Sequence, residues 1–294
     1  MLDGQGLRPP QSQWRQILHS LRHDKAAILG ALVLILALIM VTIAPVLTPY
    51  DPLEQSGDPA DYLAAPSISH PMGTDDLRRD IFARVLYGGR ITLRAGVIAV
   101  LAAASAGMIL GMIAGFYGGR VDEVIGRLID IILAIPGILL AIVILAILGP
   151  GLQNAMFAVA VSFIPTFARL ARGATFTEKN KDYVLAARAL GGSTWHIIRK
   201  HILRNVIAPV IVIGTLTVAS AIQIAAGLGF LGLGAQPPHP EWGAMLSNGR
   251  TYISTGEWWM TVFPGLAIFL VVLAINLFGD GLRDALDPRL RNIG

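Results

Sequence analysis

Residues that could perform chemistry are few and scattered in this sequence. Asp75, Asp76 and Asp80 form one acidic cluster that could hold a cation. The cluster stands before an apolar helical pattern, where carboxylates stabilise a helix N-terminus. Arg78 and Arg79 lie within the cluster and offer ion pairs, and the spacing does not match a calcium loop. We therefore interpret the cluster as structural and predict no metal site.

Other catalytic or cofactor-binding patterns are missing from the sequence. It contains no P-loop, no His-Glu-x-x-His, no Gly-x-Ser-x-Gly and no cysteine. His196 and His201 are five residues apart, which is not the helical spacing of a metal-binding pair. Gly227 to Gly232 spell G-x-G-x-x-G but end an apolar run, whereas a dinucleotide site needs a preceding strand. The sequence predicts no catalytic residue, cofactor or metal, so any energy source would have to lie on a partner.

The composition is that of a membrane protein. Of 294 residues, 54% are hydrophobic and 14% are charged, and the mean hydropathy is +0.63. Soluble domains carry roughly 25% charged residues. The basic pI near 9.6 does not indicate nucleic-acid binding, because no basic patch contains interleaved aromatic residues. We expect a lipid bilayer and no nucleic acid as the surroundings of this chain.

Apolar runs along the chain predict an all-α fold with six transmembrane helices. A helix must be long enough to cross a hydrocarbon layer about 30 Å thick in order to span the membrane. Asp130 lies in the third run, and we expect it to pair with Arg127. The second run contains a ridge of glycines at positions 107, 111 and 115, which either a neighbouring helix or a partner subunit could use. The predicted spans are residues 26–48, 95–116, 124–148, 155–170, 206–229 and 260–278.

These spans define the organisation of the chain. Residues 1–25 form a tail, 26–48 the first span and 49–94 a polar connection whose apolar spacing from Leu77 to Leu86 predicts a helix on the membrane surface. A core follows at 95–281, with a polar loop at 173–204 and a tail at 282–294. Of the 23 Lys and Arg residues, 17 fall on the side of both tails and this loop, and six fall opposite. The positive-inside rule places both termini in the cytoplasm and residues 49–94 outside it.

The polar loop contains a predicted helix, a glycine elbow and a second helix. Residues from Asp182 to Leu190 favour a helix, Gly191 and Gly192 stop it, and Ser193 can cap the next one. Such an elbow beside a membrane indicates a docking element, although an ordinary loop between spans remains an alternative. The candidate docking residues are Tyr183, Val184, Leu185, Ala186, Ala187, Arg188, Gly191 and Gly192.

The elbow resembles the cytoplasmic "EAA" loop in membrane subunits of bacterial ABC importers. Ala186, Ala187 and Gly191 match that motif, whereas Leu185 stands where it has glutamate. Residues 228–246 resemble a signature of the C-type subunit of dipeptide and oligopeptide permeases. The candidate residues of this extracytoplasmic loop are Gln236, Pro237, Pro238, Glu241, Trp242 and Gly243.

The resemblance implies a type I ABC importer transmembrane domain in a bacterial inner membrane. It implies a sister permease subunit, two ATPase subunits that bind ATP, and an extracytoplasmic solute-binding protein. Peptides are the expected substrate, with glutathione, nickel or a metallophore as alternatives in the same class. Because Leu185 replaces the acidic residue, we expect Val184, Leu185 and Ala187 to dock the ATPase by apolar burial.

Two other classes of protein are alternatives for a chain with several spans. A self-sufficient secondary transporter or channel would show inverted repeats and ionisable residues at mid-membrane, and the sequence shows no convincing repeat. A membrane enzyme would need a catalytic constellation, which the patterns above do not provide.

Overall fold

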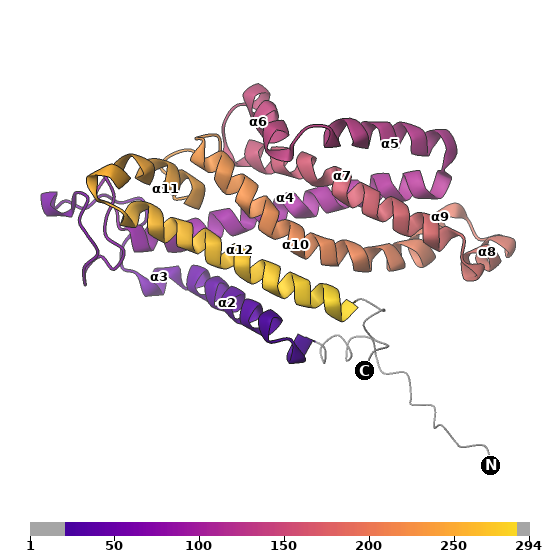
Figure 1. The fold of residues 1–294 in the computed structure, drawn as a ribbon, viewed down its shortest axis with the longest axis horizontal. Helices are drawn as coiled ribbons and strands as arrows, with labels where there is room; N and C mark the ends of the chain where they lie inside the picture. Colours follow the sequence, from indigo (N-terminus) through magenta and orange to yellow (C-terminus); the bar gives the residue numbers. More distant parts are fainter. Residues whose placement is uncertain (1–20, 287–294) are drawn as a thin grey trace, which may run out of the picture.

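The computed structural model describes residues 21–286, and these form an elongated bundle of helices with no strand (Figure 1). The helices α8 and α9 lie at one end of the long axis, and α11 lies at the other. An all-α fold is therefore confirmed. The helices are α2 (Lys25–Thr42), α3 (Ala44–Leu47), α4 (Ile81–Tyr117), α5 (Gly119–Leu133), α6 (Gly137–Leu148), α7 (Leu152–Lys179), α8 (Asp182–Ala189), α9 (Thr194–Ile197), α10 (Leu203–Phe230), α11 (Trp242–Gly249) and α12 (Trp259–Leu286). Two short 3₁₀-helices are η1 (Pro59–Asp61) and η3 (Arg250–Thr255), and a π-helical segment, η2 (Ile198–Ile202), joins α9 to α10.

Five helices among the described residues are long and apolar enough to cross a membrane, namely α2, α4, α7, the α9–α10 unit and α12. A sixth span exists only if α5 and α6 are taken together. These two helices are bent by 90° at their junction, so the span predicted over 124–148 is broken and is not one continuous helix. Pro136 explains the break, because proline disfavours helical conformation in the residue before it and lacks a backbone donor.

Helix α4 is longer than the predicted second span. It runs without interruption from Ile81 to Tyr117, so the predicted separate surface helix within residues 49–94 is wrong. Gly88 and Gly89 lie inside this helix, where they allow other segments to pack closely against it. A Cβ on Gly88 would lie 1.9 Å from the Pro240 oxygen, and one on Gly89 would lie 2.9 Å from the Trp242 ring. The polar connection outside helices therefore ends at Asp80.

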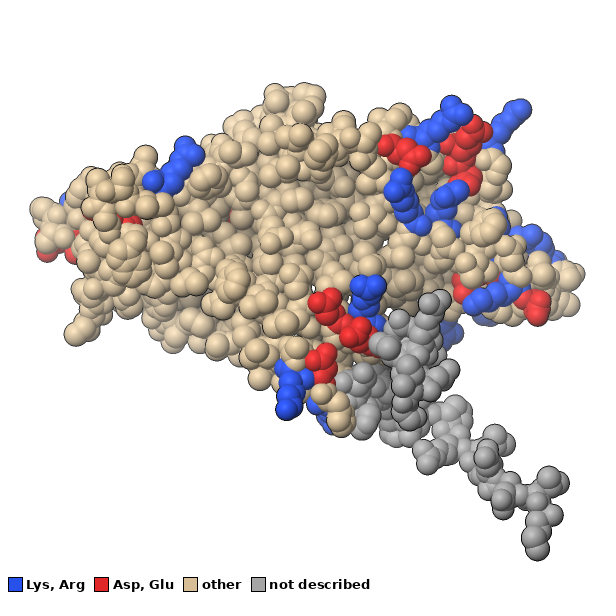
Figure 2. All heavy atoms as spheres, viewed as in Figure 1, with Lys and Arg blue, Asp and Glu red and all other residues tan. Residues whose placement is uncertain are grey.

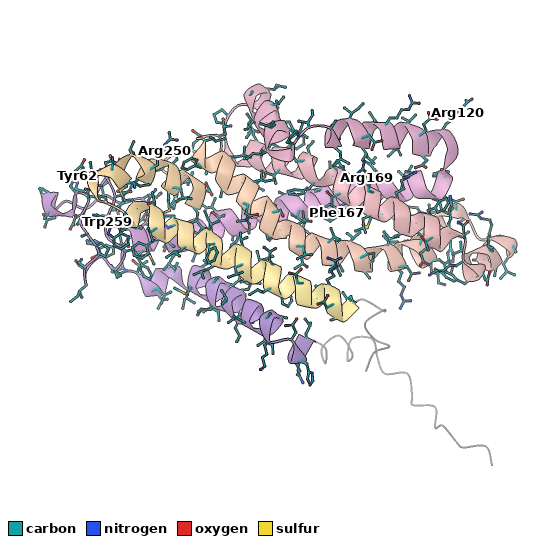
Figure 3. All side chains as sticks on the ribbon, in the orientation of Figure 1. Tyr62, Arg120, Phe167, Arg169, Arg250 and Trp259 are labelled. Carbon is teal, nitrogen blue, oxygen red and sulfur yellow. The ribbon has the colours of Figure 1, made fainter. Side chains whose placement is uncertain are left out.

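The glycine ridge on α4 packs against α7 of the same chain. A Cβ on Gly107 would lie 2.6 Å from the carbonyl oxygen of Ile164, and one on Gly111 would lie 2.3 Å from that of Ala168. Such backbone approach is what small residues four apart allow. This contact brings α4 and α7 together around the core that contains Phe167 (Figure 3).

The charged residues of α5 pair differently from the prediction. Asp130 binds Arg169 of α7 at 2.6 Å, and Arg127 binds Glu123 at 2.5 Å, so the predicted Arg127–Asp130 pair is wrong. Figure 2 shows Lys and Arg concentrated toward the end of the molecule that carries α5, α8 and α9. The predicted tails fall mostly in residues 1–20 and 287–294, outside the described part of the chain.

The acidic cluster of the polar connection is structural. Asp75 forms a buried ion pair with Arg79 at 2.7 Å, whereas Asp80 caps α4 through the backbone N–H of Ala83 and contacts His70 at 2.8 Å. Asp80 therefore pairs with a histidine and not with Arg78 or Arg79. Among residues 21–286, no group of three or more histidine and carboxylate side chains is arranged to hold a metal ion.

Candidate functional site

The elbow between α8 and α9 is built by local backbone rules. Helix α8 ends at Ala189, and the N–H groups of Gly191 and Gly192 donate to the carbonyls of Arg188 and Ala187, each at 3.0 Å. This pair of bonds defines a Schellman motif, which requires a left-handed residue after the helix. Gly191 has φ of +81°, in agreement with that requirement. The side chain of Ser193 accepts from His196 N and caps α9, as the sequence predicted.

One face of the elbow is anchored in the protein. Val184 is fully buried and belongs to the same core cluster as Ile197, Ile202 and Val206. Val184 therefore holds α8 against its own chain, and its predicted place on the docking face is wrong. An eight-residue helix carries too little periodicity to show from sequence which of its apolar residues faces inward.

Other apolar side chains of the elbow are exposed. Leu185 is 48% exposed, Leu190 is 89% exposed and Trp195 is 69% exposed. Sequence reasoning singled out Leu185 but missed Leu190 and Trp195. Their positions beside the elbow could have indicated them, because Leu190 is the C-cap of α8 and Trp195 lies in the first turn of α9. These three residues are called the apolar tip below.

An unpredicted glutamate joins the elements around the elbow. Glu178, near the end of α7, is mostly buried and accepts hydrogen bonds from Lys181 at 2.5 Å, from Asn205 at 3.1 Å and from the Tyr183 hydroxyl. Asn205 also donates to the Tyr183 hydroxyl at 2.8 Å. Burial, followed by the hydrogen bond to Glu178, raises the pKa of Tyr183. The network ties α7, α8 and α10 together.

The second candidate region divides into a buried clamp and an open loop. The clamp consists of Glu241, Trp242 and Gly243. Glu241 accepts from the backbone N–H groups of Gly243 and Ala244 at 2.8 and 2.9 Å and caps α11, while the Trp242 indole donates to the Val85 carbonyl at 2.8 Å. These residues fasten α11 to α4 and α10 and are not placed to bind a solute.

The open part of this region is the loop that contains Gln236, Pro237 and Pro238. Together with residues of α4, of the preceding connection and of α11, it lines a cavity of about 310 Å³. Three of its lining residues belong to α11, which lies at the end of the bundle opposite the elbow (Figure 1). The two predicted groups of site residues are therefore not brought together but stand at the two ends of the bundle.

A bundle of long apolar helices with a braced elbow at one end and a polar cavity at the other has the architecture of a transporter's membrane subunit. The family model for "Binding-protein-dependent transport system inner membrane component" matches residues 107–292. The model for "N-terminal TM domain of oligopeptide transport permease C" matches residues 12–66. The chain belongs to this family of binding-protein-dependent inner membrane components, as a C-type permease of the dipeptide and oligopeptide branch. It is thus a multi-pass inner membrane protein.

Several relatives are similar over nearly the whole chain. The dipeptide transport system permease protein DppC of Alkalihalophilus pseudofirmus is 46% identical over 290 residues, which cover 97% of this chain and 94% of that protein. The glutathione transport system permease protein GsiD of Pectobacterium atrosepticum is 44% identical, with 96% and 93% covered. Among solved structures, the MetNI methionine ABC transporter in an inward-facing conformation aligns with a TM-score of 0.54 and 22% identity. That alignment covers 69% of this chain and 97% of the other, and it shows the type I importer transmembrane fold.

Proposed function

We propose that this chain is one half of the membrane path of an ATP-driven peptide importer. A sister permease forms the other half, and a solute-binding protein delivers the peptide from outside. Two ATPase subunits bind ATP and Mg²⁺ and dock at the cytoplasmic face. The observation that carries the proposal is the elbow, where buried Val184 and the Glu178 network brace a helix whose Leu185, Leu190 and Trp195 are exposed.

The geometry supports a direct route from the ATPase to the membrane. The apolar tip would enter a cleft of the ATPase, because exposed apolar side chains gain free energy when a partner covers them. Glu178 joins the end of α7 to α8, and η2 continues from α9 into α10. Closure of the ATPase pair would therefore move α7 and α10 together and change access to the path.

Uptake by the reconstituted system tests this proposal. The permease, its sister subunit, the two ATPases and the binding protein are placed in proteoliposomes, and uptake of a labelled dipeptide is measured with and without ATP. We expect ATP-dependent uptake that is lost when the binding protein is omitted. Uptake that persists without ATP and follows an ion gradient would assign the chain to the secondary transporters instead.

Glutathione is a second candidate substrate, because relatives named as glutathione permeases are as similar as some named for dipeptides. Glutathione is itself a short peptide with free termini, so the same path could carry it. Competition of unlabelled glutathione against the labelled dipeptide, first on the isolated binding protein and then in uptake, separates the two. Competition at the binding protein would identify glutathione as a substrate of the same importer.

A further inference from the structure

A polar groove opens at the end of the molecule opposite the elbow. Its cavity of about 310 Å³ lies near the lower end of the range for small-ligand sites, roughly 300–1,000 Å³. Two arginines of the polar connection and α4, Arg79 and Arg84, line it together with Asp76. Gln236 and Asn248 line it as well, from the proline loop and from α11.

Two guanidinium groups share one carboxylate in the wall of this groove. Arg79 is 5% exposed and Arg84 is 3% exposed, and both contact Oδ2 of Asp75, at 2.7 and 3.5 Å. Arg84 also donates to the Pro52 carbonyl at 2.8 Å. Each guanidinium has more N–H donors than these bonds use, so the pair can still bind an anionic group.

An acidic group lies on the same lining. Asp76 has one long hydrogen bond, from the Tyr252 hydroxyl at 3.4 Å, and its carboxylate is therefore weakly engaged. The lining of the groove thus carries both positive and negative charges. It also carries the side-chain amides of Gln236 and Asn248. A lining of this kind complements a small zwitterion better than a simple anion or an apolar solute.

We propose that this groove is a transient binding site for a short peptide with free termini, on its way from the binding protein to the membrane path. Arg79 and Arg84 would receive the peptide carboxylate, and Asp76 would receive its ammonium group. The inference rests on the proposed function and extends it by placing a substrate site on the permease itself.

Protection of a single cysteine tests the site directly, since the chain contains no cysteine of its own. Ser247→Cys places a thiol on the groove lining, and Ser69→Cys places one on the exposed polar connection outside the groove. Both variants are assembled with the sister permease and the ATPases, without binding protein, and reacted with a hydrophilic thiol reagent. We expect a saturating free dipeptide to slow labelling of Ser247→Cys at least threefold and to leave Ser69→Cys unchanged.

The charge of the lining provides the specificity test. Asn248→Asp, added to Ser247→Cys, changes one amide to a carboxylate of the same shape, and we expect the half-protecting dipeptide concentration to rise at least fivefold. A dipeptide with an amidated C-terminus should protect the parent variant weakly. Equal protection by the free and the amidated peptide, or protection unaffected by Asn248→Asp, would overturn the assignment of the carboxylate to the arginines.

Uptake by the same cysteine variants keeps this inference separate from the proposed function. Binding-protein-dependent dipeptide uptake without any protection of Ser247→Cys would reject the groove while leaving the importer intact. Absence of both uptake and protection would reject the peptide importer and the groove together. Protection without uptake would support the groove and show that the missing step lies elsewhere in the assembly.

Discussion

Some residues of the elbow anchor it in the permease, and others are exposed for docking to the ATPase. Leu190 is the most exposed residue of the apolar tip, so covering it with an ATPase should stabilise the complex by roughly 1.5–3 kcal/mol. We expect Leu190→Ala to weaken ATPase binding by about 1–2 kcal/mol, or roughly 5- to 30-fold. Lys181→Ala should weaken ATPase binding less, because its ammonium group is already paired with Glu178 of the same chain. Co-purification of the solubilised complex measures both effects.

A salt series and a buried control distinguish the possible outcomes. Val184→Ala should lower the stability of the permease itself by roughly 1–3 kcal/mol, because it opens a cavity in the core. At roughly 0.5 M salt, where screening is nearly complete, the wild-type ATPase should stay bound. Binding that is lost in salt but insensitive to Leu190→Ala would mean that the interface is electrostatic.

The buried Glu241 predicts a pH dependence of stability. Burial raises the pKa of this carboxyl above its ordinary 4.5, against the lowering effect of the bonds from Gly243 and Ala244. The folded state then binds the proton more tightly than the unfolded state, so the free energy of unfolding falls as pH rises from about 4.5 through the raised pKa. We expect Glu241→Gln to remove this fall, as measured by thermal unfolding in detergent.

Truncation at the same position provides the comparison. Glu241→Ala loses the cap of α11 and should be less stable at every pH, by about 0.5–2 kcal/mol. If the glutamine variant and the wild type showed the same pH profile, the carboxyl would not be the group that titrates.

Sequence reasoning placed single residues well only where a local rule governs them. Gly191 and Ser193 were assigned correctly, because a left-handed C-terminal residue and an N-cap depend on a few neighbouring residues. The partner of Asp130 was missed, because Arg169 is 39 residues away and only packing brings it near. For the same reason, nothing in the sequence distinguished buried Val184 from exposed Leu185.

At the scale of elements, the elbow depends on one backbone conformation. A Cβ at Gly191 would meet no atom within 4 Å, so the effect of a substitution there is conformational and not steric. We expect Gly191→Leu to insert normally but to abolish transport, since a side chain at positive φ costs roughly 1 kcal/mol or more. Gly191→Asn should retain much of the activity, because asparagine tolerates this conformation. Uptake at the wild-type rate by the leucine variant would remove the elbow from the mechanism.

The contact between α4 and α7 depends on the absence of a side chain. Gly111→Ala would place a methyl group 2.3 Å from the Ala168 carbonyl oxygen and force the helices apart. We expect a loss of roughly 1–3 kcal/mol in stability, as for other overpacked sites. Gly173→Ala, within α7, meets nothing within 4 Å and should be neutral or stabilising by up to about 1 kcal/mol. Thermal unfolding of the two variants in detergent should therefore differ, and equal midpoints would contradict the close packing.

Element boundaries were harder to predict than elements. Long apolar runs identified α2, α4, α7, α10 and α12, because a predominantly apolar stretch of about 20 residues is typical of a transmembrane helix. The bend between α5 and α6 was missed although Pro136 marked it, since hydrophobicity alone does not distinguish a broken span from a straight one. The unbroken start of α4 was missed because the sequence does not show that Gly88 and Gly89 pack against Pro240 and Trp242.

At the scale of the whole molecule, the orientation in the membrane remains a prediction. We expect the elbow and both termini in the cytoplasm and α11 outside, because the topology predicted from sequence assigns 17 of the 23 basic residues to the side of the elbow. A membrane-impermeant thiol reagent added to intact cells should label Ser247→Cys and not Ser193→Cys. The reverse labelling pattern would invert the topology and withdraw the docking role of the elbow.

The 90° break between α5 and α6 has a consequence for the surrounding lipid. Helix α6 has 12 residues, which at about 1.5 Å each span roughly 18 Å of a hydrocarbon layer about 30 Å thick. On this side of the bundle the apolar length is therefore too short for the bilayer, a case of hydrophobic mismatch. The backbone donors at the start of α6 also need polar partners that acyl chains do not provide. This flank should thin the membrane around it or be shielded by another protein, so permease assembly should respond to lipid chain length.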